Sequence, residues 1–306
     1  MSAFPAPTMP APPVAVVGLG QMGGSLAAAL AAAGRPVSGW DVDPAARAAA
    51  EARGTRITRD LDGVVVLAVP LPAMDGVLDG LTVAPGATVT DLGSVKHPVL
   101  ATVGARYGSR YVGGHPMCGT ERSGHQAVDP ELFRGARWAV CLEAATELPR
   151  WLRVAEVALA VGAEVVPATA AEHDDAVAAI SHVPHLLAAA LAAAAAEAGP
   201  LALNLAAGSF RDGTRVAGSD PALVTAMVQG NAGPTAAALD RVRAQLDRPW
   251  PDLVAAGAAV ARRTSGRRPV RVPLDRPALL ALGRAGGAVT RRLAAFVEGW
   301  VPDDGA

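Results

Sequence analysis

The stretch Val14-Ala15-Val16-Val17-Gly18-Leu19-Gly20-Gln21-Met22-Gly23-Gly24-Ser25-Leu26-Ala27 lies near the start of the 306-residue chain and decides its fold. Its apolar start predicts a buried strand, its glycines a tight turn, and its alanine-rich end a helix to about residue 33. The glycines permit the close approach of a pyrophosphate, and the helix N-terminus offers free N–H groups to phosphates. The stretch therefore predicts a dinucleotide-binding turn, with Gly18, Gly20, Gln21, Met22 and Gly23 as cofactor contacts.

A second predicted strand, residues 36–40, ends at Asp41. At this distance from the glycines a carboxylate can accept hydrogen bonds from the adenosine ribose 2′-OH. The alternative is that Asp41 caps the helix that begins near Pro44. Asp43 adds a negative charge, and Arg47, the one nearby cation, is expected to face solvent. The cofactor is therefore predicted to be NAD rather than NADP, because no Arg or Lys follows Asp41 directly to neutralise a 2′-phosphate.

Beyond Asp41, short apolar strands alternate with helices. The strands lack polar alternation, which is typical of strands buried on both faces of a parallel sheet. Val69, at the end of one strand, is a further cofactor candidate. The pattern predicts a doubly wound, mainly parallel α/β Rossmann domain over residues 14–168. Its expected strands are residues 64–69, 87–91, 111–114, 137–142 and 164–167, and its expected helices are residues 44–53, 71–81, 97–107 and 149–161.

From residue 170 the pattern becomes helical, which predicts an all-helical substrate and dimerisation domain over residues 169–264. The long first helix is rich in Ala and Leu and carries more apolar surface than one sheet-packed domain can cover, which favours a homodimer. The Pro- and Ala-rich residues 1–13 are expected to form a disordered tail, and residues 265–306 a helical tail whose packing the pattern does not fix. Expected helices cover residues 170–198, 201–207, 221–229, 234–247 and 251–263, with one or two more over 277–300.

Composition narrows the classes of function. The 27 Lys and Arg against 28 Asp and Glu give no electrostatic reason to expect nucleic acid or an anionic membrane as a partner, so small-molecule chemistry is favoured. Cys118 and Cys141 form no CxxC pair, which indicates a reducing cytosol, a cytoplasmic protein and no structural zinc. The N-terminus lacks the basic start and apolar run of a signal peptide. The longest apolar run, residues 186–196, is too short to cross a bilayer and is expected to be a buried helix.

One histidine lies in the stretch Gly113-Gly114-His115-Pro116-Met117-Cys118-Gly119-Thr120-Glu121-Arg122-Ser123-Gly124. His115 directly follows a predicted strand, at the sheet edge where the cofactor is expected. Its imidazole titrates near neutral pH, and the glycines let a substrate approach the backbone, so it has the chemistry of a general base. The alternative is a structural histidine in a glycine-rich turn.

Three further stretches carry polar side chains. Ser94, in Asp91-Leu92-Gly93-Ser94-Val95-Lys96, is expected at the same sheet edge, where its hydroxyl can bridge substrate and base or cap a helix. His182 and His185 are spaced i,i+3 on one helix face, but no third ligand is evident, so no metal site is predicted. The polar loop over residues 208–221 is either ordinary surface or a binding loop in which Arg215 clamps a carboxylate.

Together these stretches resemble the prephenate/arogenate dehydrogenase family of tyrosine biosynthesis, over about residues 14–247. Five motifs occur in order: the glycine turn at 18–23, the DxxSVK-like 91–96, the GHPMxGTExSG-like 114–124, the HD…SHxPH-like 173–185 and the FRDxTR…SDP-like 210–221. Two features depart from the family. Val224 stands where many members carry Trp, and the tail does not resemble the regulatory domain that some members append.

The resemblance implies a role for each candidate side chain. It implies that His115 is the catalytic base and that Ser94 holds the reacting hydroxyl. It also implies a helical, dimerising second domain. The residues that it implies contact the substrate are Arg215, His182, His185, Thr120 and Glu121.

The implied reaction is NAD-dependent oxidation of a ring hydroxyl with loss of the ring carboxylate as CO2, which converts prephenate to 4-hydroxyphenylpyruvate. Arogenate, or a related amino-substituted prephenate, is the alternative substrate. The β-hydroxyacid dehydrogenases share the architecture but use a lysine on the helical domain, and the one lysine here, Lys96, precedes that domain. A non-catalytic NAD-binding module is a remaining alternative, which the joint presence of Ser94, His115 and Arg215 disfavours.

Overall fold

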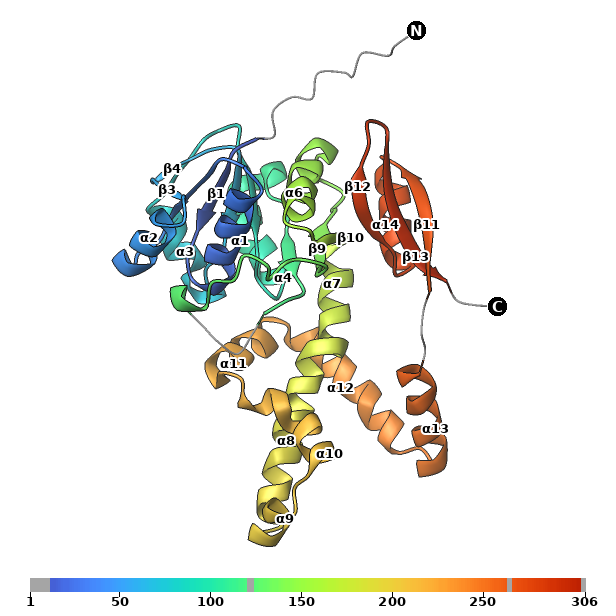
Figure 1. The fold of residues 1–306 in the computed structure, drawn as a ribbon. Coiled ribbons are helices and arrows are strands. Elements are labelled where there is room, and N and C mark those ends of the chain that lie inside the picture. The colour runs from blue at the N-terminus through green and yellow to red at the C-terminus, as the bar shows by residue number, and fades with distance from the viewer. Residues whose placement is uncertain (1–11, 120–123, 263–265, 304–306) are drawn as a thin grey trace.

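The computed structural model describes residues 12–119, 124–262 and 266–303, and it falls into three parts (Figure 1). A Rossmann domain is followed by helices that extend away from it, and the chain then returns to form a small α/β unit beside the second half of the Rossmann sheet. The predicted Rossmann fold with a helical domain after it is confirmed. Most of the predicted N-terminal tail, residues 1–11, lies outside the described residues.

The first sheet is parallel and five-stranded, in the order β3-β2-β1-β5-β7. Its central strands bury every side chain, as expected for apolar strands covered on both faces. Residues 14, 16, 64 and 66 face a core shared with α1 and α6, and residues 15, 17, 65 and 67 face α3 and α5. The strands are β1 (Val14–Val17), β2 (Val37–Trp40), β3 (Arg56–Ile57), β5 (Val64–Leu67) and β7 (Thr88–Asp91), and a separate pair is formed by β4 (Asp60–Leu61) and β6 (Thr82–Val83).

The helices of the Rossmann domain begin where the sequence supplies caps. Asp43 caps α2 through the backbone N–H of Ala45, and Pro44 occupies the first turn. The predicted helix 97–107 is continuous but contains a π-helical turn. The helical elements are α1 (Gln21–Ala32), α2 (Pro44–Glu51), η1 (Leu71–Ala73), α3 (Met74–Asp79), α4 (His97–Val99), η2 (Leu100–Gly104), α5 (Ala105–Tyr107), η3 (Gly108–Arg110), η4 (His125–Ala127) and α6 (Leu148–Ala160).

A second sheet continues the first and has the order β11-β13-β12-β10-β9-β8. The sequence predicted a strand at 111–114, but Tyr111 makes only an isolated bridge to Val89, and the strand is β8 (Gly114–Pro116). β8 runs antiparallel to β9 (Arg137–Cys141), with His115 opposite Ala139, and β9 runs parallel to β10 (Glu164–Ala168). His115 therefore lies within a strand rather than just beyond one.

The helical domain is built on one long helical run. It begins at a capping box, in which Thr169 and Glu172 exchange side-chain and backbone hydrogen bonds. It continues as α7 (Ala170–Val177), the π-helical turn η5 (Ala178–His182) and α8 (Val183–Glu197). The remaining elements are α9 (Pro200–Asn204), α10 (Gly208–Thr214), η6 (Arg215–Gly218), α11 (Pro221–Gly230), α12 (Ala232–Leu246) and α13 (Trp250–Ala261).

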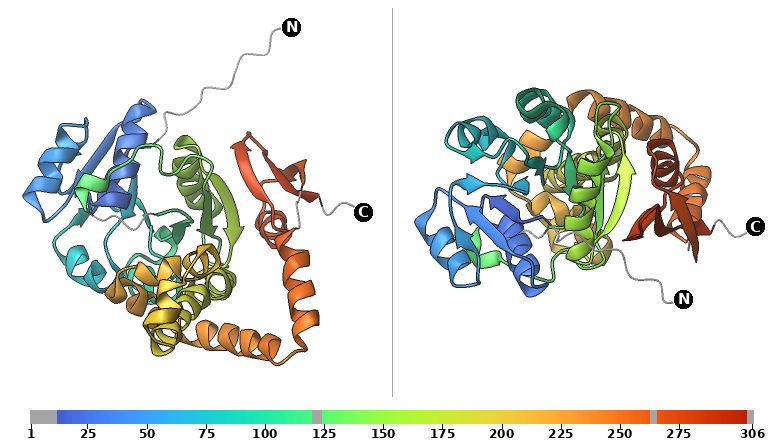
Figure 2. Two further views of the ribbon diagram at one scale, coloured as in Figure 1. Left: turned by 60° about the horizontal axis from the view of Figure 1, so that its bottom comes forward. Right: turned by 90° about the horizontal axis from the view of Figure 1, so that it is seen from above.

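The long helical run is more exposed than the sequence suggested. By length and composition, 170–197 is the one helix among the described residues that could cross a membrane, yet only 28% of its apolar window is buried. The expectation of a buried helix at 186–196 was wrong for the single chain, since Leu187 and Leu191 are 39% and 47% exposed. Figure 1 shows this helix extending beyond the Rossmann domain with α9 and α10 beside its far half, and Figure 2 shows the same region with its lower end turned forward.

The C-terminal prediction was also wrong. Residues 266–303 are not a helical tail but three strands and one helix, β11 (Gly266–Pro273), α14 (Arg276–Arg284), β12 (Ala288–Arg292) and β13 (Phe296–Asp303). β12 pairs with β10, so the unit extends the Rossmann sheet. The strands are stabilised by tertiary contacts, because Val289 and Val297 pack against apolar side chains of α14 and β10. The sequence of the segment alone does not distinguish strand from helix, because Arg, Gly and Pro interrupt its apolar pattern.

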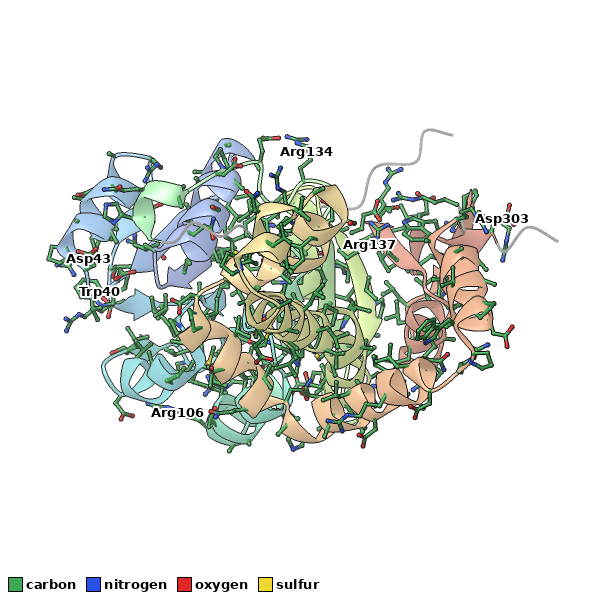
Figure 3. The ribbon with its side chains drawn as sticks, turned by 90° about the horizontal axis from the view of Figure 1, so that it is seen from below. Trp40, Asp43, Arg106, Arg134, Arg137 and Asp303 are labelled. Atoms are coloured by element: carbon green, nitrogen blue, oxygen red, sulfur yellow. The ribbon has the colours of Figure 1, made fainter. Side chains whose placement is uncertain are left out.

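The C-terminal unit is tied to the Rossmann sheet by one cluster. Glu164 of β10 pairs with Arg137 and Arg267 and accepts a hydrogen bond from Trp300 Nε1 at 3.0 Å. Both guanidinium groups stack on the Trp300 ring, 4.6 and 4.5 Å from its centre. Figure 3 places Arg137 on the side of the Rossmann domain that faces this unit. The unit is therefore part of one continuous sheet and not a separate appendage.

Candidate functional site

The glycine turn has the geometry that the sequence predicted. Gly18 has φ +89°, and a Cβ there would lie 2.5 Å from the carbonyl oxygen of Ala68 and 2.8 Å from Val69 Cγ1. A Cβ on Gly23 would collide with the Gly18 carbonyl. These two glycines are thus required by the protein itself, for the turn and for helix packing. Val69 borders the turn.

Gly20 differs from its two neighbours because a Cβ there would meet nothing within 4 Å. The open side of Gly20 faces out from the N-terminus of α1, whose first residues are Gln21 and Met22. Helix N-termini carry N–H groups without partners within the helix, and these bind phosphates well. The turn therefore fits a dinucleotide pyrophosphate, with Gly20 as the glycine that the ligand, not the protein, requires.

Asp41 is directed at the glycine turn. Its Oδ2 accepts from the Leu19 backbone N–H at 2.5 Å, and its Oδ1 accepts from the Asp43 N–H at 2.8 Å. The alternative role, as cap of α2, belongs to Asp43 instead. Asp41 is half-buried beside the turn, the position of a ribose-binding carboxylate.

Two arginines close to Asp41 in the sequence or the fold stack on the ring of Trp40. Arg47 stacks on its ring at 4.6 Å and donates to the carbonyl oxygens of Asp41 and Val42 at 2.7 and 3.1 Å. Arg59, which the sequence did not suggest, stacks on the same ring at 4.3 Å. Figure 3 shows Trp40 and Asp43 close together at the end of the Rossmann domain. The expectation that Arg47 faces solvent was therefore wrong.

His115 meets the helical domain through a chain of side chains. Its Nδ1 lies 2.8 Å from Nε2 of His173, whose own Nδ1 lies 2.8 Å from Oδ1 of Asp174. The two rings meet edge to face, 5.1 Å apart. His173 and Asp174 are only 4% and 2% exposed. The junction between the two domains thus holds a chain of three side chains, the half-buried His115 and the buried His173 and Asp174.

The chain fixes which ring nitrogens carry protons. A carboxylate only accepts, so His173 Nδ1 must donate to Asp174, and a neutral His173 then presents an unprotonated Nε2. That nitrogen accepts from His115 Nδ1–H. A neutral His115 therefore keeps its lone pair on Nε2, the nitrogen that faces away from His173.

The electrostatics keep both histidines neutral. Burial, then the nearby His173, Lys96 and His182, hold the pKa of His115 well below its ordinary value of 6.5. Burial also lowers the pKa of His173, although Asp174 opposes the shift. Burial opposes ionisation of Asp174, but hydrogen bonds from His173 and from the backbone of His97 and Lys96 hold the pKa of this carboxyl below its ordinary range.

Asp174 is also the anchor between the domains. Its Oδ1 and Oδ2 accept from the backbone N–H groups of Lys96 and His97, each at 2.8 Å, at the start of α4. These donors belong to a helix N-terminus, which favours a negative charge. The alternative in which Ser94 caps this helix was wrong, because the carboxylate of Asp174 in the helical domain caps it.

A second buried cluster holds β8 in place. Asp91, at the end of β7, accepts from Tyr111 Oη at 2.7 Å and Gly114 N at 3.2 Å, and it pairs with Lys96. The Lys96 ammonium also donates to the Gly114 carbonyl at 2.6 Å. Lys96, the one lysine of the chain, is 1% exposed. The cluster thus fixes the residue that precedes His115.

The structure places the other predicted residues as follows. Ser94 is half-buried on the loop between β7 and α4, at the same sheet edge as the glycine turn. His182 is fully buried in η5, and the half-buried His185 donates from Nδ1 to the Ser181 carbonyl at 2.8 Å. Arg215 is exposed in η6, which packs against α8. Thr120 and Glu121 lie outside the described residues.

Sequence reasoning missed the partners of these residues. His173 and Asp174 belong to a recognised motif but received no role. The Thr169-x-x-Glu172 capping box just before them was the available signal, because it sets the first turn of α7. Asn231, 3% exposed, had no local signal at all: it reaches Asp174 and His182 from the junction of α11 and α12.

The fold and these geometries define a two-domain dinucleotide-binding protein with a histidine-centred site at the domain junction. Two family models match the chain, "Prephenate dehydrogenase, nucleotide-binding domain" over residues 26–167 and "Prephenate dehydrogenase, dimerization domain" over residues 169–250. The chain belongs to the prephenate/arogenate dehydrogenase family. Both matches end before the C-terminal α/β unit.

Curated relatives support this assignment. A cyclohexadienyl dehydrogenase of Zymomonas mobilis is 31% identical over 76% of this chain and 85% of its own length. A prephenate dehydrogenase of Bacillus subtilis is 32% identical over 69% of this chain. The chain spans 52% and 62% of the length of the prephenate dehydrogenases of Lactococcus lactis and Bacillus subtilis.

Solved structures of similar proteins also support the family assignment. A candidate prephenate dehydrogenase of Corynebacterium glutamicum is 40% identical with TM-score 0.75, covering 82% of this chain and 86% of its own. Aquifex aeolicus prephenate dehydrogenase, solved with hydroxyphenyl propionate and NAD+, is 28% identical with TM-score 0.72, covering 81% and 92%. Synechocystis arogenate dehydrogenase is 29% identical with TM-score 0.70, covering 81% and 97%.

The glycine turn yields a testable contrast. Gly20→Ala is expected to leave the melting temperature nearly unchanged but to weaken dinucleotide affinity by about tenfold or more, because the methyl group occupies only ligand space. Gly18→Ala is the matched control and is expected to lower the melting temperature, since its methyl group meets Ala68 and its φ is positive. Calorimetric titration and thermal melting check both. Unchanged affinity in Gly20→Ala would place the pyrophosphate elsewhere.

Proposed function

We propose that the protein is an NAD-dependent dehydrogenase that oxidises and decarboxylates prephenate to 4-hydroxyphenylpyruvate, a step of tyrosine biosynthesis. The observation that carries the proposal is the chain from Asp174 through His173 to His115, which leaves an unprotonated Nε2 on a neutral histidine. A neutral imidazole with a fixed lone pair is what a ring hydroxyl needs for removal of its proton. Arogenate is the alternative substrate, and both kinds of enzyme occur among the structural relatives.

In this proposal the side chains mainly orient the substrate and shield it from water. His115 Nε2 takes the hydroxyl proton, while His173 and Asp174 hold the ring and stabilise the imidazolium that forms. Ser94, on the loop beside β8, holds the hydroxyl oxygen, and Arg215 pairs with a substrate carboxylate. NAD, when bound at the glycine turn, supplies the hydride acceptor. Loss of CO2 aromatises the ring and drives the reaction, so the protein chiefly needs positioning and exclusion of water.

The first prediction concerns the base. His115→Asn should lower kcat by about 100-fold or more with prephenate and NAD, since general bases contribute about 10² to 10⁴ in rate. In the unmodified protein, protonation of His115 at low pH disables the base. Because its pKa lies well below 6.5, kcat/KM should stay flat from neutral pH down past 6.5 and fall only below that.

The matched control is His97→Asn, which changes an exposed imidazole and keeps the backbone N–H that Asp174 accepts. It should retain near-normal turnover. NADH formation at a range of pH values, with prephenate and arogenate in parallel, measures all of this and identifies the preferred substrate. Near wild-type turnover in His115→Asn would remove the mechanism.

The second prediction concerns the choice of NAD over NADP. The Asp41 carboxylate accepts hydrogen bonds from a ribose 2′-OH but repels a 2′-phosphate. We expect kcat/KM to favour NAD by at least about tenfold, or about 1.4 kcal/mol. Asp41→Ser should narrow the gap, because the Arg47 and Arg59 guanidinium groups on Trp40 are the nearest cations to a 2′-phosphate. Equal use of both cofactors by the unmodified protein would contradict a ribose role for Asp41.

The third prediction is a homodimer made through the helical domain. Large apolar side chains are exposed along its helices, among them Leu191 at 47%, Leu201 and Leu205 at 70%, Trp250 at 80% and Val254 at 68%. Exposed apolar patches of this extent mark interaction surfaces. A second copy is the occupant, because residues 169–250, which carry Leu191, Leu201, Leu205 and Trp250, match a dimerisation domain, and Val254 lies just beyond this range.

Light scattering at micromolar concentration should give the mass of a dimer. Val254→Glu should shift the equilibrium towards monomer, since a charge would be buried in the interface. The control is Val42→Glu, at a valine of the Rossmann domain that is 77% exposed against 68% for Val254, and it should leave the mass unchanged. A monomeric unmodified protein would contradict the proposal.

A further inference from the structure

The feature that the reaction scheme leaves unused is Asn231, at the start of α12. Its Nδ2 lies 2.7 Å from the backbone oxygen of Asp174 and 3.2 Å from His182 Nδ1. Asn231 and His182 are 3% and 0% exposed, so no water competes for these contacts. The side chain therefore joins α12 both to the residue that anchors the His115 chain and to a second buried histidine.

The contact with Asp174 settles which way the amide points. A backbone carbonyl only accepts, so the atom that faces it must be the NH2 group, and a flipped amide would set two acceptors 2.7 Å apart. The NH2 group has two hydrogens. One goes to Asp174, and the other points at His182 Nδ1.

His182 Nδ1 must therefore accept. If it carried a proton, two N–H groups would face each other at 3.2 Å in a buried site. The Thr235 hydroxyl, 3.3 Å from the same nitrogen, can donate to it as well. A neutral His182 then carries its proton on Nε2, and this buried Nε2–H has no hydrogen-bond partner among the described residues.

We infer that Asn231 is a positioning residue that holds His182 as a neutral Nε2–H donor for a carboxylate oxygen of the substrate, beside a His115 whose Nε2 is held as an acceptor. The inference rests on the proposed function for the identity of the ligand. Two histidines with opposite tautomers would then act on the same substrate: one removes a proton, and the other donates a hydrogen bond.

The charged and titratable groups around His182 are consistent with a neutral ring. Asp174 and His173 face it from α7 and His185 from α8, while α12 presents only the uncharged Asn231 and Thr235. Burial is the largest effect and lowers the pKa of His182 to about 4, against the opposing field of Asp174. A neutral donor needs no proton uptake, so substrate KM should not vary with pH across the neutral range.

The tautomer can be measured without any substrate. Two-bond 15N–1H correlations on protein labelled at its six histidines distinguish Nδ1–H from Nε2–H, and a His182→Gln variant identifies the signals. We expect an Nε2–H tautomer for His182. An Nδ1–H tautomer in the unmodified protein would overturn the inference. The tautomer itself is read from the unmodified protein, and the His182→Gln variant serves only to assign its signals.

Asn231→Asp tests the consequence for the substrate. A carboxylate at this position accepts from His182, moves its proton to Nδ1 and raises its pKa. A neutral His182 in this variant then presents the lone pair of Nε2 to the substrate. Only protonation of His182 to the imidazolium restores an Nε2–H donor. KM should therefore rise by about tenfold or more, the cost of a hydrogen bond to a charged group. The rise should be larger at about pH 8 than at about pH 5, with a smaller effect on kcat.

The matched control is Thr235→Val, which removes the weaker contact to the same nitrogen and keeps the side-chain shape. It should keep the Nε2–H tautomer and a pH-independent KM. A tautomer that changes in Thr235→Val but not in Asn231→Asp would overturn the role of Asn231. An Nε2–H tautomer in a protein that turns over neither prephenate nor arogenate would leave the tautomer assignment standing and remove the proposed function alone.

Discussion

The carboxylate of Asp174 is the interaction on which the site depends. It accepts from two backbone N–H groups of the Rossmann domain and from His173 of its own helix, so one buried group fixes both the domain junction and the His115 ring. Buried carboxylates are costly unless every oxygen is satisfied, and here the start of α4 satisfies them. Moving α7 relative to the Rossmann sheet would break both backbone hydrogen bonds to Asp174 and the hydrogen bond between His173 and His115.

The Rossmann side of the junction is held by a different buried charge. Asp91, Lys96 and Tyr111 fasten β8 to the end of β7, and removing one partner of such a pair typically costs about 3–5 kcal/mol. The π-helical turn η5 on the helical side brings His182 towards Asn231. Such turns are frequent at functional sites because they break the regular spacing of a helix. Each side of the junction thus has its own irregular or buried feature close to His115, a buried charge cluster on the Rossmann side and a π-helical turn on the helical side.

The C-terminal α/β unit and the long helix show where local patterns stop being informative. β12 pairs with β10, and β11 and β13 are joined to β10 through the Glu164, Arg267 and Trp300 cluster. These contacts are made across more than a hundred residues of sequence. α8 packs against η6 and α10 but leaves Leu187 and Leu191 39% and 47% exposed, so its apolar composition suggested more burial than a single copy provides. In both cases the deciding partner lies outside the segment itself.

The sequence by itself determined the features whose causes are local. The glycine turn and Asp41 at the end of β2 follow from backbone sterics and from strand and helix periodicity, so the Rossmann and helical domains could be predicted. The candidate roles of His115, Ser94 and Arg215 came instead from ordered motifs that resemble those of a known family. Only the tertiary structure decided that Asp174 caps α4, that His173 orients His115 and that Asn231 faces His182. Hydrogen bonds between distant residues leave no periodic signal in a sequence, and proton positions on imidazoles are set by such bonds.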